Sequence, residues 1–447
     1  MNGAFIHRAW EASMRKYTYS CFFAVAIAAS PLAQGCTDIA DADDVAQQSD
    51  PFRGKGDKLQ NGKKFPNASG DSETFNPLGS TDLTNEFFQD LGSNGRRCVT
   101  CHDPADGWSI RPKSVKARFD ATAGKDPIFR PNDGSNSPNA DVATVGARRK
   151  AYSMLLTKAV IRIGMPIPAN AEFELIEVDD PYGFASAKEL SLFRRPLPAA
   201  NLGCLNRIMW DGRETSPKGL LAGLANQANN ATLGHAEGDP LSQATLESIV
   251  SLEINLANSQ SHHDGAKELH AAEAHGGPEY LADEDCSELG FNIYDAWIDA
   301  PGGGVNVTRR AVARGQAIFN DVCGGFCHDV GNVGNNSRAL FFDIGISEAS
   351  RRTSDMPLYT FRNLQTDEIV ATTDPGRALI TGRWDHMNEF KTPGMRGLAA
   401  RAPYFHDGSA ATLDDVVDFY ASPQFKGPPI NLTAQERADL VAFLEAL

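Results

Sequence analysis

The motif Cys98-Val-Thr-Cys101-His102 places two cysteines three positions apart and a histidine directly after the second. In a CxxCH sequence the two thiols add to the vinyl groups of haem and the histidine ligates the iron. A structural zinc site is the alternative, but zinc needs four ligands, and no second cysteine or histidine pair lies close to this motif in the sequence. The motif therefore predicts a covalent c-type haem on Cys98 and Cys101, with His102 as an iron ligand.

A second motif, Cys323-Gly-Gly-Phe-Cys327-His328, has one more residue between its cysteines. The extra residue departs from the CxxCH rule. Taken alone, the motif is compatible with a haem and also with a disulfide between Cys323 and Cys327. Features elsewhere in the chain must decide between these two interpretations.

Length and charge restrict the classes of function. A chain of 447 residues is too long for one compact core and predicts two domains behind a leader. The net charge of -15 argues against nucleic acid or an anionic membrane as the main partner, because both require basic patches. The same charge favours solubility and a cationic protein partner.

Residues 1–36 have the pattern of an export signal. Arg15 and Lys16 precede an apolar run over residues 21–29, which is too short to span a bilayer. The following Leu32-Ala-Gln-Gly-Cys36 is similar to a bacterial lipobox, in which Cys36 becomes lipidated; ordinary cleavage nearby is the alternative. Both routes predict a protein of the periplasm or outer membrane, either lipid-anchored through Cys36 or soluble after cleavage.

The rest of the chain divides into a tether and two folded units. Residues 37–76 are rich in Asp, Gly, Lys and Ser and predict a flexible tether. The stretch Pro301-Gly-Gly-Gly304 separates an N-terminal haem domain over residues 77–300 from a C-terminal haem domain over residues 301–447. Because the periodic signal is helical between long loops, we expect a mostly α fold. Cys204 and Cys286 either pair as a disulfide or stay as lone buried thiols.

Two capping boxes predict helices near the C-terminus. Thr433 begins one, with Glu436 at the capping-box position, and Thr412 begins the other, with Asp415 at that position. Helical spacing then places on one apolar face of the second helix Leu413, Val416, Val417 and Tyr420.

Two longer stretches resemble one known family. The run from Phe390 to Tyr420, which contains Tyr404-Phe-His-Asp-Gly-Ser409, and the stretch Met209-Trp-Asp-Gly-Arg213 are similar to sequences of bacterial dihaem cytochrome c peroxidases, including their MauG-like branch. Together with the two haem motifs, the resemblance covers most of residues 80–447. It implies two cytochrome c-like helical domains that each hold one covalent haem. The second motif is then a haem site whose extra residue forms a bulge.

The resemblance also implies a division of labour between two haems. His102 would ligate the haem at which peroxide is reduced, and His328 would ligate the haem through which electrons enter. Trp210 matches the tryptophan that lies between the haems in this family, although an ordinary buried aromatic residue is the alternative. A small donor protein, such as a monohaem cytochrome c or a cupredoxin, would deliver the electrons.

Tyr420 stands fourteen residues after His406. At this position the peroxidases proper have a methionine and the MauG-like branch has a tyrosine, so the resemblance implies that Tyr420 ligates the second haem iron. A phenolate donates more electron density than a thioether and should lower the potential of that iron. The alternative is a core tyrosine whose hydroxyl is hydrogen-bonded.

Some features of the family have no clear counterpart here. No histidine lies between His102 and His235, which would leave an open position on the first iron for peroxide. His235 and Glu237 are candidates for the acid or base that moves a proton between the peroxide oxygens, and a solvated loop is the alternative for both. Arg195 stands near the place of the asparagine that helps to hold calcium in the family, which argues against calcium in this chain.

The sequence thus predicts a dihaem c-type oxidoreductase, a cytochrome c peroxidase-like enzyme that reduces hydrogen peroxide with electrons entering through the C-terminal haem. One alternative is MauG-like oxidation of a partner protein or a small substrate. Another is a non-enzymatic dihaem electron carrier in which both irons are six-coordinate.

Overall fold

The computed structural model describes residues 56–447, so the predicted signal peptide, Cys36 and the first part of the predicted tether lie outside the described residues. Helix accounts for 32% and strand for 17% of the structure, with 13 strands in several sheets. The prediction of a mostly α fold is therefore wrong, and the fold is mixed α/β. The strands have only two to seven residues, which is too short for a clear alternation in the sequence.

A four-stranded sheet begins inside the segment that was predicted as a tether. Its order is β2-β3-β8-β9, formed by Lys64–Pro66, Gly70–Phe75, Ala257–His263 and Lys267–Glu268, and a separate pair joins β1 (Lys58–Gln60) to β4 (Ser80–Asp82). The tether prediction is wrong for residues 58–75, because antiparallel pairing with β8 satisfies the backbone groups of β3. Trp108 Nε1 also donates to Thr74 Oγ1 at 2.8 Å, which ties β3 to the region of the first motif.

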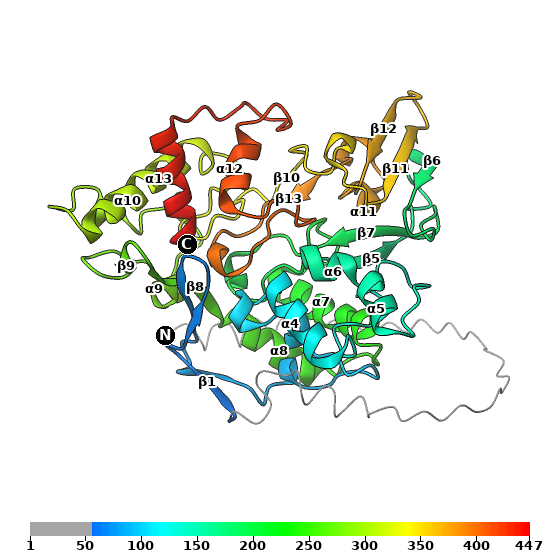
Figure 1. Cartoon of the computed structure of the whole chain (residues 1–447), viewed down its shortest axis with the longest axis horizontal. Helices are drawn as coiled ribbons and strands as arrows, with labels where there is room; N and C mark the ends of the chain where they lie inside the picture. The colour runs from blue at the N-terminus through cyan, green and yellow to red at the C-terminus, as the bar shows by residue number, and fades with distance from the viewer. Residues whose placement is uncertain (1–55) are drawn as a thin grey trace.

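Short helices surround the first motif, itself the single turn α3 (Cys98–Cys101). α7 (Leu220–His235) packs on α8 (Gln243–Ile254), and the three other helices of this region are α4 (Pro112–Thr122), α5 (Val145–Ala151) and α6 (Ser153–Lys158). In Figure 1 these helices lie together below a short ribbon formed by β5 (Ile161–Met165) and β7 (Leu190–Arg194).

The C-terminal helices form a second core. α10 (Val305–Val322) packs on α13 (Ala434–Glu445), and a Cβ added at Gly315 would lie 1.9 Å from the carbonyl oxygen of Asp439, so only glycine permits this close approach. α12 (Leu413–Tyr420) starts at Thr412 with the predicted capping box, and α13 starts at Thr433 with the other. Both helix predictions are confirmed. The short elements of this half are α11 (Ala378–Thr381), β10 (Phe341–Phe342) and β13 (Phe390–Lys391), whereas α9 (Pro278–Ala282) packs on β8.

The two halves of the chain share a sheet. β11 (Leu358–Asn363) lies between β12 (Ile369–Thr372) and β6 (Phe173–Asp179), so a strand from before residue 300 pairs with strands from after it. In Figure 1 this sheet lies at the right, and α10, α12 and α13 lie at the left. The halves are therefore interlocked by strand pairing as well as by side chains. The boundary at Pro301 stays a prediction.

Candidate haem and peroxide site

The first motif presents its histidine in the form that a metal needs. His102 Nδ1 lies 3.1 Å from the carbonyl oxygen of Trp108. Because a carbonyl only accepts hydrogen bonds, Nδ1 carries the proton and the Nε2 lone pair is left for a metal. Burial lowers the pKa of His102 to about 4, so the ring is neutral near pH 7.

One cavity contains all three side chains of this motif. Cys98, Cys101 and His102 line it, and both thiols are free of disulfides. Much of the remaining wall is apolar, as the positions of Phe87, Leu91, Ile161, Leu197, Leu224 and Ala228 show. Two thiols free of disulfides and an imidazole held through Nδ1, beside an apolar wall, fit the donor set of a c-type haem.

His235, at the C-terminal end of α7, lies on the same cavity. Its Nδ1 forms a short hydrogen bond with a carboxylate oxygen of Asp133, and Asp133 is also ion-paired with the buried Arg96. Burial acts to raise the pKa of Asp133, but Arg96 and His235 together hold it below its ordinary value. The carboxylate therefore stays charged and fixes the orientation of the His235 ring through Nδ1.

The structure separates the two residues that the sequence offered as the proton-transfer group. Glu237 is exposed, has a positive φ of 53° and is absent from the cavity lining, whereas His235 is part of that lining. Asp133, which supports His235, was missed because it lies in a turn-forming stretch about a hundred residues earlier in the chain.

A second missed residue is Glu253 of α8. Its side chain lines the cavity, only 5% of its surface is exposed, and Oε2 has no hydrogen-bond partner within residues 56–447. Burial raises the pKa of Glu253 to about 8, so the carboxyl is mostly protonated at neutral pH. A signal was present in the sequence, since Glu253 stands three and four positions after the apolar residues Val250 and Ile249.

Trp210 lies where the first cavity meets the C-terminal half. It lines the cavity and also packs in a cluster with Phe390 and Phe419. Its ring meets that of His406 edge-on with centroids 6.3 Å apart, and His406 stacks on Phe390 at 4.2 Å. The prediction that Trp210 is the aromatic residue between two haems stays a prediction, but its neighbours come from both halves of the chain.

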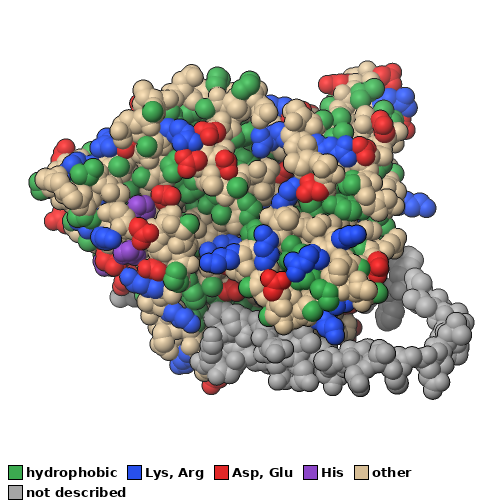
Figure 2. Space-filling view, in the orientation of Figure 1, with side chains coloured by type: hydrophobic (Ala, Val, Ile, Leu, Met, Phe, Trp, Pro, Cys, Tyr) green, Lys and Arg blue, Asp and Glu red, His purple; other side chains and the backbone are tan. Residues whose placement is uncertain are grey.

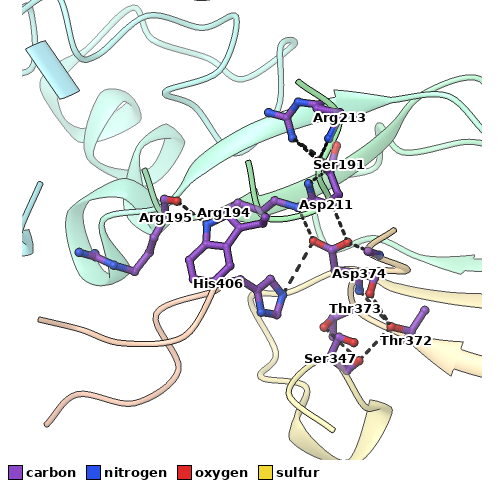
Figure 3. Close-up of polar contacts among 12 residues, drawn as sticks. Ser191, Arg194, Arg195, Asp211, Arg213, Ser347, Thr372, Thr373, Asp374 and His406 are labelled. Atoms are coloured by element: carbon purple, nitrogen blue, oxygen red, sulfur yellow. Dashed lines mark hydrogen bonds and ion pairs between the residues drawn. The ribbon is translucent and has the colours of Figure 1, made fainter. Parts of the chain in front are cut away.

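A buried charge network adjoins this aromatic group (Figure 3). Arg194 binds Asp374 with Nε at 2.7 Å and Nη2 at 2.9 Å, and its Nη1 binds Asp211, which Arg213 also contacts. Burial acts to raise the pKa of Asp211, but Arg194 and Arg213 hold it below its ordinary value. His406 Nε2 lies 3.8 Å from Asp374, so the network reaches the ring that contacts Trp210.

The second motif prepares its histidine in the same way. His328 Nδ1 lies 2.7 Å from the carbonyl oxygen of Gly334, which leaves Nε2 for a metal, and burial lowers the pKa of His328 to about 4. Cys323 and Cys327 are both free thiols, so the disulfide interpretation of this motif is not what the structure contains. The extra residue gives a turn on which Phe326 is 50% exposed, with Arg338 over its ring.

Tyr420, the last residue of α12, lies near the second motif. Its partly buried ring packs against Phe405, Phe419 and Phe425, and no hydrogen bond of its hydroxyl occurs among the described residues. Burial raises its pKa, with further contributions from the nearby Cys323 and Cys327. The absence of a hydroxyl partner there argues against a hydrogen-bonded core tyrosine, and ligation of an iron by Tyr420 stays a prediction.

Of the two interpretations of Cys204 and Cys286, a disulfide or two lone buried thiols, the structure contains the disulfide. Histidine side chains gather at the left edge of Figure 2, where Lys and Arg are otherwise interspersed with Asp and Glu. Over residues 56–447 no group of three or more His, Cys, Asp or Glu side chains is placed to hold a metal ion. Over the same residues, no helix is long and apolar enough to cross a membrane.

Comparison with known proteins gives relatives of one kind, although no family model matches the chain. The cytochrome-c peroxidase IdrP1 of Pseudomonas sp. (strain SCT) is 31% identical over 179 residues, which is 36% of this chain and 45% of the relative. The methylamine utilization protein MauG of Methylorubrum extorquens is 43% identical over 65 residues, which is 13% of this chain and 18% of the relative. The chain is therefore similar, over part of its length, to cytochrome c peroxidases and to MauG.

This finding confirms the resemblance that the motifs predicted, and it supports c-type haem binding by the chain. The chain spans less than half the length of the first curated cytochrome c peroxidases that it matches, with 45% and 24% covered in two of them. A solved MauG-like protein associated with microbial copper homeostasis has 20% identity and a TM-score of 0.35, covering 59% of this chain and 75% of that chain.

Proposed function

We propose that this chain reduces hydrogen peroxide at the first motif and receives electrons through the second. The observation that carries the proposal is the single cavity shared by the motif Cys98–His102 and by His235, whose ring is held by the Asp133–Arg96 ion pair. The names of the homologous peroxidases support a peroxidase-like oxidoreductase.

The chain's own residues would hold the cofactor and move the proton. Cys98 and Cys101 would carry the haem as thioethers, and His102 Nε2 would ligate an iron that supplies the electrons and a binding position for peroxide. His235 Nε2 would take a proton from one peroxide oxygen and give it to the other as the O–O bond breaks. The Asp133 carboxylate would stabilise the charged imidazole between these two steps. With two electrons and two protons in all, hydrogen peroxide becomes two molecules of water.

Electrons would enter at the motif Cys323–His328 and pass the Trp210 ring. Tyr420 would be a second protein ligand for the group held at His328, which would make this site a relay and leave peroxide chemistry to the first site. The electron donor would be a small protein such as a monohaem cytochrome c or a cupredoxin. The Cys204–Cys286 disulfide supports a periplasmic location, and a lipid anchor on Cys36 is part of the same proposal.

One alternative has a specific observation in its favour. Tyr420 lies beside the second motif at the position that the MauG-like branch gives to a tyrosine, and MauG is among the homologues. This favours an enzyme that uses peroxide to oxidise a partner protein or a small substrate. Product analysis separates the two, because simple peroxidase turnover consumes a donor electron for each oxidising equivalent.

Steady-state peroxide turnover of the exported holoprotein with reduced small donors tests the proposal. We expect turnover in the unchanged protein and in Glu237→Gln, because that side chain is exposed and outside the cavity. Absence of turnover in a preparation that mass spectrometry shows to carry haem would contradict the peroxidase function.

A further inference from the structure

The guanidinium of Arg195 is enclosed by main-chain carbonyl oxygens. Nη1 donates to Lys158 at 3.0 Å and to Ala159 at 3.4 Å, and Nη2 donates to Ile110 and to Arg401, both at 2.8 Å. The residue is 5% exposed. Four carbonyl oxygens around one buried cation take the place of the water that the charge has lost.

No ion pair of Arg195 occurs within residues 56–447, unlike its neighbour Arg194, which binds two carboxylates. Burial and the nearby Arg401 lower the pKa of Arg195 to about 9, with Asp106 opposing this shift. The Arg195 guanidinium is therefore still charged near pH 7, and the dipoles of the surrounding carbonyl groups stabilise this charge. Two of these carbonyls, Lys158 and Ala159, belong to the C-terminal end of α6, where helix geometry leaves carbonyl groups free for a cation.

The four carbonyls come from separate parts of the fold. Ile110 follows the first motif, Lys158 and Ala159 end α6, and Arg401 lies in the C-terminal half just before His406. The fork of a guanidinium has enough donors in one plane to reach all three segments at once. Removal of the side chain would leave several buried carbonyls without partners, at a cost for each.

The main chain of the same residue holds the aromatic group between the motifs. Trp210 Nε1 donates to the Arg195 carbonyl oxygen at 2.8 Å, and the Arg195 N–H donates to the His406 carbonyl oxygen at 2.6 Å. Figure 3 shows Arg195 beside Arg194 and His406 at this junction. The position of the guanidinium and the position of the indole are therefore set by one residue.

We propose that Arg195 is a positioning residue whose guanidinium acts as a built-in cation, bound by four carbonyls, that fixes the Trp210 indole between the two halves of the chain. The functional part of this inference rests on the proposed electron path between the two motifs. The structural part needs no electron path: the guanidinium, bound by carbonyl oxygens, keeps the segments around Trp210 and His406 ordered.

Chemical rescue of Arg195→Ala in the holoprotein tests the proposal. The readouts are hydrogen–deuterium exchange of the peptides that contain Arg195, Trp210 and His406, and the rate of electron transfer between the two motifs. We expect faster exchange in all three peptides and electron transfer slowed by at least about tenfold, because small displacements of a positioned group cost this much. Guanidinium at a low, non-denaturing concentration should restore both, whereas the neutral isostere urea should restore neither.

Arg148→Ala is the matched control. Arg148 also donates to main-chain carbonyls, of Ala123 at 2.7 Å and Val142 at 2.9 Å, but it has no contact with Trp210. This variant should leave the three peptides and the electron-transfer rate unchanged. Unchanged exchange in Arg195→Ala, equal rescue by urea, or an equal effect of Arg148→Ala would each overturn the proposal.

If Arg195→Ala does not fold, Arg195→Lys replaces it, since lysine keeps the charge but loses the planar fork. We then expect partial loss of protection at Trp210, and full protection would overturn the proposal. A failure of the proposed function appears differently, as an absence of peroxide turnover in the unchanged protein, while the exchange experiment on Arg195 keeps its meaning.

Discussion

The two attachment motifs carry the same three reactive side chains in unlike surroundings. In both motifs the histidine, His102 or His328, forms a hydrogen bond from Nδ1 to a main-chain carbonyl oxygen, so that Nε2 is the nitrogen left for a metal. The first motif faces a cavity that is also lined by His235 and the buried Glu253, whereas the second has Tyr420 nearby. The motif is alike in both places, so under the proposed function it is the surrounding residues that separate peroxide chemistry at the first motif from electron relay at the second.

The extra residue of the second motif follows from where that motif sits on its helix. The first motif forms a single helical turn, with His102 at its end. In the second, Cys323 is already the C-cap of α10, and the chain leaves the helix through Gly324, whose added Cβ would lie 3.0 Å from the Cα of Asn320. A non-helical turn needs a different number of residues to bring the second thiol back, which is consistent with the exposed Phe326.

Loss of the His235 imidazole should have the largest effect and should be confined to the first motif. We expect His235→Gln to lower peroxide turnover by about 10²–10⁴-fold, the usual contribution of a positioned acid or base. Steady-state kinetics with small donors measure this, and Glu237→Gln is the control. Equal turnover in His235→Gln and the unchanged protein would show that His235 is not the proton-transfer group that distinguishes the first motif from the second.

Replacement of Tyr420 should change the second motif alone. In Tyr420→Met, a thioether replaces the phenol, so we expect the potential of the second haem to rise by on the order of a hundred millivolts. Spectroelectrochemical titration measures both haems in one experiment. Tyr280→Met, at a side chain that is 45% exposed, is the control. A change in the first haem, or in neither, would show that Tyr420 is not a ligand of the second.

The buried Glu253 carboxyl should make stability depend on pH. Its pKa in the folded protein is raised to about 8 from an ordinary 4.5, so folding favours the protonated form. The contribution of this carboxyl to the free energy of unfolding is fully present below pH 4.5, the ordinary pKa, and is lost as the pH rises through about 8.

Relative to Glu253→Gln, the unchanged protein should lose on the order of 3 kcal/mol of unfolding free energy between pH 5 and pH 8.5. Urea denaturation at both pH values measures the difference, and the exposed Glu279→Gln is the control. Parallel pH curves for Glu253→Gln and the unchanged protein would mean that the cavity leaves this carboxyl solvated.

The smallest effect should follow a change at the exposed ring of the second motif. Phe326→Ser should alter the free energy of unfolding by no more than about 1 kcal/mol, since the side chain is half-exposed. Mass spectrometry should still find the haem attached through Cys323 and Cys327. Loss of that haem would show that the extra residue shapes the attachment site itself and does not merely form a surface turn.

The sequence predicted the parts of this site that depend on local order. The two motifs, the capping box at Thr412 and the inward face of α12 follow from the spacing of neighbouring residues. Asp133 and Arg195 form hydrogen bonds with residues that are far away in the sequence, and no local sequence pattern predicts such contacts. The strands near the N-terminus were missed for the same reason, since β3 depends on pairing with the distant β8.

Electron paramagnetic resonance of the resting ferric holoprotein, beside that of Tyr420→Met, tests the central claim most directly. We expect one high-spin signal from an open site at His102 and one low-spin signal from a closed site at His328, with only the low-spin signal changed by the substitution. Two low-spin signals in the resting protein, or a change in the high-spin signal alone, would contradict the division between the two motifs.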